Sequence, residues 1–100
     1  MELVVIDGQG GGLGRQIVQM IKRRFPSQPI TAIGTNSSAS AAMLKAGADY
    51  SATGENPVVV AARKADIIIG PIGIVIADAL LGEVTPRMAL AVSASSAKRL

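Results

Sequence analysis

A chain of 100 residues is the length of one domain, and residues 1–100 are taken as a single domain of which about half is apolar. The sequence has no Cys and no His, which excludes disulfides, thiol catalysis and the commonest metal ligands, so we predict no metal site. A net charge of +3 and only two aromatic side chains argue against a nucleic-acid surface. No signal peptide is visible and the longest apolar stretch is too short to span a membrane, so a cytoplasmic protein is expected.

Strand and helix patterns alternate along the first half of the chain. Short apolar runs predict strands, and a stripe of apolar residues at helical spacing predicts the first helix. The predicted elements are a strand over Leu3–Asp7, a helix over Leu13–Phe25, a strand over Ile30–Gly34, a helix from a cap at Ser37 or Ser38 through Ala46, and a short strand over Asp49–Ala52.

The second half continues this alternation. Proline directly after a capping residue predicts a helix start at two places. The predicted elements are a helix from Asn56-Pro57 to about Lys64, a strand over Asp66–Gly70, an apolar segment over Ile74–Leu81 that fits a buried helix or a strand, and a helix from Thr85-Pro86 to about Lys98.

This order of elements predicts an α/β fold. We expect a Rossmann-like, doubly wound parallel sheet of about four strands in the order 3-2-1-4, with helices on both faces forming three layers. The chain stops at Leu100, where a fifth strand is expected to begin, so we expect a C-terminal truncation. Strand four would then be an unpaired apolar edge, which predicts association into a homo-oligomer.

A glycine cluster lies between the first strand and the first helix. Five of the seven residues from position 8 to position 14 are glycine. Glycine lets backbone N–H groups come close to a ligand, and the start of a helix attracts anions. The alternative is a tight turn that holds no ligand. The loop that we predict to bind a nucleotide phosphate consists of Asp7, Gly8, Gln9, Gly10, Gly11, Gly12, Leu13 and Gly14.

The spacing of these glycines distinguishes between known types of phosphate-binding loop. The dinucleotide pattern G-x-G-x-x-G is absent, because Leu13 stands where the third glycine belongs, and the Walker pattern is absent as well. Gly8, Gly12 and Gly14 form G-x-x-x-G-x-G, so the loop resembles that of short-chain dehydrogenases. This resemblance implies NAD or NADP as the cofactor. We expect valine at position 12 or 14 to abolish binding and to leave the fold largely intact.

The same resemblance does not extend to a catalytic pair. Short-chain dehydrogenases use Tyr-x-x-x-Lys, whereas Tyr50 is followed by Gly54 at that spacing. Glu55 is the best candidate for a proton-transfer group if the protein is an enzyme, and the alternative for its segment is a turn and helix cap. Whether the chain is catalytic stays open.

In an open α/β sheet, ligands bind beyond the carboxyl ends of the strands, where the strand order reverses. This position lies between strands one and four, so a second glycine-rich loop is expected to line the site. Its residues are Gly70, Pro71, Ile72 and Gly73. The alternative is a tight turn fixed by the proline.

The end of the second strand is the expected position of the ribose. Thr35, Asn36 and Ser37 are predicted to hydrogen-bond a ribose or a 2′-phosphate, or else to cap a helix. No acidic residue and no arginine follows this strand, so we expect a weak preference between NAD and NADP. Asp7 is expected to hold amides of the glycine loop, with a cation bridge or a ribose contact as the alternative.

Five segments together carry a second resemblance, and it covers the whole chain. They are Ile6–Gly14, Gly34–Asn36, Ala46–Asp49, Ala52–Asn56 and Ile69–Ile74. The sequence is similar to a small bacterial family of uncharacterised function. The resemblance implies a longer protein with a further strand, and it implies no particular activity.

Three functions fit these observations. The first is a nucleotide-binding or dinucleotide-binding protein that serves as a sensor or binding subunit. The second is an NAD(P)-dependent oxidoreductase completed by a missing C-terminus or by a partner. The third is a structural or interaction module that binds no ligand.

Overall fold

The computed structural model describes residues 1–100 and contains five strands and four α-helices. No helix combines the length and the hydropathy that a bilayer crossing requires. In chain order the elements are β1 (Leu3–Asp7), α1 (Gly12–Arg24), β2 (Ile30–Gly34), α2 (Ser37–Lys45), β3 (Tyr50–Thr53), α3 (Glu55–Lys64), β4 (Ile67–Ile69), the 3-10 helix η1 (Ile72–Val75), α4 (Pro86–Ala94) and β5 (Lys98–Arg99).

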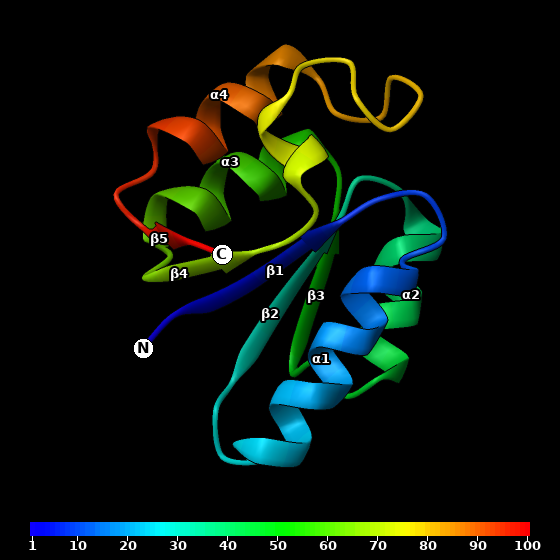
Figure 1. The fold of residues 1–100 in the computed structure, drawn as a ribbon, viewed down its shortest axis with the longest axis vertical. Coiled ribbons are helices and arrows are strands. Elements are labelled where there is room, and N and C mark those ends of the chain that lie inside the picture. The colour runs from blue at the N-terminus through cyan, green and yellow to red at the C-terminus, as the bar shows by residue number, and fades with distance from the viewer.

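All five strands are parallel and lie in the order β3-β2-β1-β4-β5. The central strand β1 pairs Leu3 with Ile30 of β2 on one side and with Ile67 of β4 on the other. Figure 1 shows α1 and α2 together on one side of the sheet and α3 and α4 together on the other. The predicted α/β class with a parallel sheet is therefore confirmed.

The sheet separates two apolar cores, because successive side chains of a strand point to opposite faces. In β1, Val4 and Ile6 belong to the core beneath α3 and α4, whereas Leu3 and Val5 belong to the core beneath α1 and α2. Val5 is fully buried, as expected for the central strand of a parallel sheet. The glycine cluster thus follows directly on a buried central strand, which holds its first residue in place.

The predicted strand count and order need a correction at the C-terminal end. The sheet has a fifth strand, because the last helix ends at Ala94 and not near Lys98. Ser95 is extended, and its hydroxyl donates to the carbonyl oxygen of Ala62 in α3 at 2.6 Å. The chain then returns along β4, and β5 covers the strand that was predicted to be the open edge. The expected association through β4 therefore loses this basis.

The segment predicted as a buried helix or strand over Ile74–Leu81 is neither. It begins in η1 and continues as turns, with positive φ at three non-glycine residues, Asp78, Leu80 and Leu81. These left-handed conformations cannot be part of a regular helix or strand. The turns are closed by backbone hydrogen bonds, including one of 2.7 Å from the Asp78 N–H to the Val84 carbonyl.

Two helix starts also differ from those predicted. Asn36, and not Ser37 or Ser38, caps α2, because its extended backbone lets its side chain accept from the Ala39 N–H at 2.9 Å. Helix α3 begins at Glu55 after Gly54, which has a φ of 110°. The predicted cap at Asn56 therefore lies within the first turn of the helix.

Candidate functional site

Asp7 joins the end of β1 to the start of α1. Its Oδ1 accepts from the Gly8 N–H at 2.8 Å, and its Oδ2 accepts from the Gly14 N–H at 2.6 Å. The side chain is buried, and these two bonds satisfy both oxygens. Asp7 therefore holds the glycine loop in shape, as the sequence indicated, and its charge neutralises part of the helix N-terminus from within.

Three glycines of this loop are required by the packing of the protein itself. A Cβ at Gly8 would lie 2.6 Å from Oγ1 of Thr35, and a Cβ at Gly14 would lie 2.6 Å from the Met43 sulfur. Gly11 has a φ of +74°, and a Cβ there would lie 2.8 Å from Cα of Ala39. The expectation that valine at position 14 leaves the fold intact is therefore revised, since that side chain has no room.

The remaining two glycines of the loop have a different environment. A Cβ at Gly10 or at Gly12 would meet no atom within 4 Å, and neither residue has a positive φ. The Gly10 N–H donates no hydrogen bond within the protein. Gly12 and Leu13 open α1, so their N–H groups have no partner within the helix. The loop thus presents backbone donors on an open side.

The end of β2 lies beside this loop. The Asn36 side-chain amide donates to the Gln9 carbonyl at 2.9 Å, and the Thr35 N–H donates to the Asp7 carbonyl at 3.0 Å. The structure therefore brings together two segments that the sequence assigned to one site. Ser37 is exposed as the first residue of α2.

A residue that sequence reasoning missed lies at the same place. Glu83, just before α4, directs its Oε1 to three donors: the Gln9 N–H at 2.7 Å, the Thr35 hydroxyl at 2.7 Å and the Asn36 amide at 2.9 Å. A carboxylate therefore lies beside the end of β2, where the sequence shows no acidic residue nearby.

The surroundings of Glu83 keep it ionised. The hydrogen bond from the Thr35 hydroxyl and that from the Gln9 N–H hold the pKa of Glu83 below its ordinary value, with a smaller contribution from Asn36. Partial burial opposes this effect and is outweighed. At neutral pH the side chain is thus a carboxylate that accepts hydrogen bonds and donates none.

In the second glycine-rich loop, one of the two glycines is required by a backbone contact. A Cβ at Gly70 would overlap the carbonyl oxygen of Ile6, so β1 itself requires this glycine. Pro71 precedes η1, Ile72 is exposed, and a Cβ at Gly73 would lie at an ordinary 3.4 Å from Cβ of Ala79. The geometry of this loop is explained by the fold.

Glu55 belongs to a different cluster on α3 and α4. Its Oε2 accepts from the Thr85 hydroxyl at 2.5 Å, and its Oε1 lies 3.8 Å from a guanidinium nitrogen of Arg87. Thr85 in turn caps α4. The cluster thus links the starts of two helices, which fits the turn-and-cap alternative.

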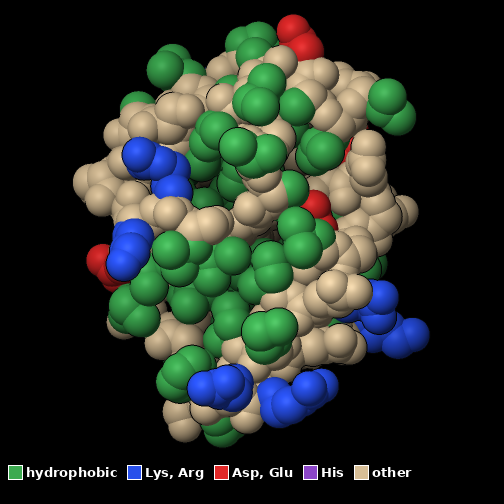
Figure 2. Space-filling view, viewed as in Figure 1, with side chains coloured by type: hydrophobic (Ala, Val, Ile, Leu, Met, Phe, Trp, Pro, Cys, Tyr) green, Lys and Arg blue, Asp and Glu red, His purple; other side chains and the backbone are tan.

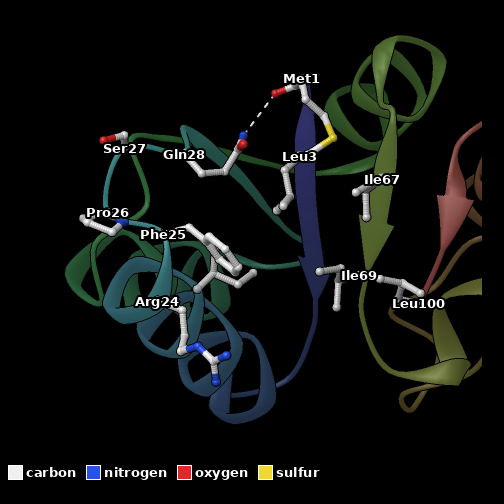
Figure 3. A pocket seen from close by; sticks show the side chains of 11 residues that line it. Met1, Leu3, Arg24, Phe25, Pro26, Ser27, Gln28, Ile67, Ile69 and Leu100 are labelled. Carbon is white, nitrogen blue, oxygen red and sulfur yellow. Dashed lines mark hydrogen bonds between the residues drawn. The ribbon is translucent and has the colours of Figure 1, made fainter.

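A large apolar cavity lies away from the glycine loop. It has a volume of about 710 Å³ and lies between the C-terminal end of α1 and strands β1 and β4 (Figure 3). Leu3, Ile67 and Ile69 form its floor, with Phe25 and Leu100 at its sides. Figure 2 shows hydrophobic side chains gathered on this face, with Lys or Arg side chains around them.

This cavity lacks the features of a polar ligand site. Most of its lining is apolar, and one of its polar groups, the Gln28 amide, is already bonded to the Met1 carbonyl at 3.1 Å. Small-molecule sites usually combine apolar walls with several convergent polar groups. The glycine loop lines none of the cavities described, but it offers convergent backbone donors, so we take it as the candidate site.

Comparison with known proteins identifies the family of this chain and gives no information about a ligand. Neither the curated proteins nor the solved structures include a match to this chain. The match that does exist agrees with the resemblance to a family of uncharacterised function. Residues 2–100 match the family described as domain of unknown function DUF3842, and the chain therefore belongs to this family.

Proposed function

We propose that the protein is a Rossmann-like protein that binds a nucleotide or dinucleotide, with NAD or NADP as the leading candidates, through the loop from Asp7 to Gly14. The phosphates would lie against the N–H groups of Gly10, Gly12 and Leu13. The strand order and the placement of helices on both faces support this proposal, because the loop lies where such sheets bind ligands.

The environment of Gly10 and Gly12 carries the proposal. Neither residue is glycine for lack of internal space, and neither has a backbone conformation that favours glycine. What glycine still provides at these positions is access for something outside the protein. A phosphate group that approaches within hydrogen-bond distance of the backbone needs such access.

The start of α1 supports an anion through its backbone and not through side-chain charge. The first turn of α1 has no acidic side chain, and the nearest free carboxylate oxygen belongs to Glu83, which is bonded to the Gln9 N–H at the other end of the loop. Asp7 is turned inward and uses both oxygens on loop amides. The helix dipole adds a partial positive charge to the N–H groups of Gly12 and Leu13.

Calorimetric titration of the folded protein with NAD, NADP, FAD and ATP tests this proposal. Gly12→Val should weaken binding at least tenfold, because a branched side chain at an open position would hold phosphates away from the backbone. Gln19→Val, which adds the same side chain to an exposed position of α1, is the matched control and should bind as the unaltered protein does.

Two results would overturn the proposal. One is that neither NAD, NADP, FAD nor ATP binds to the unaltered protein at millimolar concentration. The other is equal affinity of Gly12→Val and Gln19→Val when circular dichroism shows both to be folded.

A further inference from the structure

Glu83 reaches the candidate site from a distant part of the chain. Its Oε1 joins the loop after β1 to the end of β2, through Gln9, Thr35 and Asn36. It also lies close to the first glycine of the loop, since a Cβ at Gly8 would be 2.8 Å from Oε1. The carboxylate therefore lies at the junction of the two segments between which a bound ribose is expected.

Only one oxygen of this carboxylate is used. All three hydrogen bonds fall on Oε1, Oε2 accepts none, and Glu83 takes part in no ion pair. Because the lowered pKa keeps the group ionised, Oε2 is a free acceptor at neutral pH. A free acceptor on a fixed carboxylate suits a ligand that donates hydroxyl groups.

The position of Glu83 is fixed by its neighbours. The next residue, Val84, is buried, and Thr85 after it caps α4. The Glu83 N–H donates to the Leu80 carbonyl at 3.2 Å. Glu83 therefore lies at the anchored end of its loop. This favours a side chain that stays in the site when a ligand binds over one that must move away.

We infer that the free oxygen of Glu83 accepts hydrogen bonds from the vicinal hydroxyls of the nucleotide's ribose and selects against a 2′-phosphate. This inference rests on the proposed function. In doubly wound folds an acidic residue at the end of the second strand binds the ribose hydroxyls, whereas an arginine accommodates a 2′-phosphate. Here Thr35 and Asn36 occupy that end, and Glu83 supplies the carboxylate from elsewhere in the chain.

The inference reverses the expectation of a weak preference between the two dinucleotides. A second negative group beside Oε2 would be repelled, and no cation pairs with Glu83 to offset this repulsion. The protein should therefore bind NAD more tightly than NADP.

The test is a calorimetric comparison of NAD and NADP on four proteins: the unaltered chain, Glu83→Gln, Glu83→Ala and Asp78→Asn. We expect the unaltered protein to bind NAD at least tenfold more tightly than NADP. Glu83→Gln removes the charge at nearly constant shape and should bring the two affinities within about threefold. Asp78→Asn makes the same change of charge on an exposed residue of the same loop and should keep the preference.

The possible failures are distinguishable. If none of the four proteins binds NAD or NADP, the inference fails, and the titrations with FAD and ATP decide whether the proposed function fails with it. If both bind equally to the unaltered protein, or if Glu83→Gln keeps the preference, only the inference fails. If Glu83→Ala binds both more tightly, Glu83 covers the site and does not recognise a ribose, which also overturns the inference.

Discussion

Two glycine-rich loops follow the neighbouring strands β1 and β4, and they use their glycines differently. In the second loop, Gly70 is required by contact with β1, and Gly73 lies at ordinary distances from its neighbours. In the first loop, Gly8 and Gly14 are packed against side chains and Gly11 against the backbone of Ala39. Gly10 and Gly12, by contrast, face open space.

This difference shows what a count of glycines can and cannot indicate. A glycine in a tight contact is explained by the fold, and four of the seven glycines in the two loops are of this kind. Where an added Cβ would meet no atom and φ is not positive, the fold does not explain why the residue is glycine. By that criterion the first loop is a candidate ligand site, and the second is a packed turn that supports it.

The largest effect on stability is expected when a side chain is added at the packed end of the first loop. Gly14→Val places a branched group against the Met43 sulfur and against Cβ of Asp7, at 2.6 Å and 2.9 Å from the new Cβ. We expect a loss of about 3 kcal/mol of unfolding free energy, the upper end of typical overpacking costs.

Urea unfolding followed by circular dichroism measures this loss, since the chain has no tryptophan. Gly12→Val is the matched control and should change stability by less than about 1 kcal/mol, because the added group meets no atom. Equal stability of the two variants would contradict the distinction between packed and open glycines.

A second prediction compares the two glycines of the β4 loop. Gly70→Ala forces a Cβ against the backbone carbonyl of Ile6 in the central strand, which cannot rotate away. We expect a cost of about 2 kcal/mol in the same unfolding assay. Gly73→Ala meets its neighbours at ordinary distances and should be nearly neutral, so the reverse order of the two would refute the packing argument.

The smallest expected effect concerns pH. The pKa of Glu83 is lower in the folded chain than its ordinary value of 4.5, so its hydrogen bonds contribute stability above that pH. This contribution is lost as the pH falls below 4.5 and through the folded pKa. It should be less than about 1 kcal/mol, because the side chain is only partly buried and solvent screens its interactions.

Unfolding curves of the unaltered protein and Glu83→Gln between pH 7 and pH 3 measure the effect. The difference in stability between them should shrink as the pH falls. Asp49, whose pKa is lowered mainly by its hydrogen bond with Lys22, is present in both proteins and cancels in the comparison. A difference that stays constant with pH would show that the Glu83 charge contributes nothing to stability.

The sequence predicted the part of the fold that rests on local patterns. The bounds of β1 and β2 agree with those predicted, because buried apolar runs between turn residues are clear signals. Strand β5 was missed, since it is formed by the charged pair Lys98–Arg99, which resembles the end of a helix. The turns after η1 were missed because they place non-glycine residues such as Leu80 at positive φ.

The candidate site was predicted only in part, for a related reason. The glycine loop is contiguous in sequence, and its position after a strand and before a helix is visible from the pattern alone. Glu83 is 74 residues from Gln9 and 48 from Thr35, so no local pattern links them. Only the turns that precede α4, which the sequence did not reveal, bring this carboxylate to the site.

The buried residues of the two apolar cores come from different lengths of the chain. All seven buried residues of the core beneath α1 and α2 lie between Leu3 and Ala48. The core beneath α3 and α4 extends to Ala97. As the chain emerges from a ribosome, its first half can therefore dock two helices onto β1 and β2 before the second half exists.

This order of synthesis leaves one face of the nascent sheet uncovered. Val4, Ile6 and Ile33, all buried in the finished protein, face water until α3 and α4 arrive. Apolar surface exposed at this stage makes a partly folded chain prone to aggregation. The unequal division of the cores thus makes the interval between the emergence of α2 and that of α4 the period in which the growing chain is most prone to aggregation.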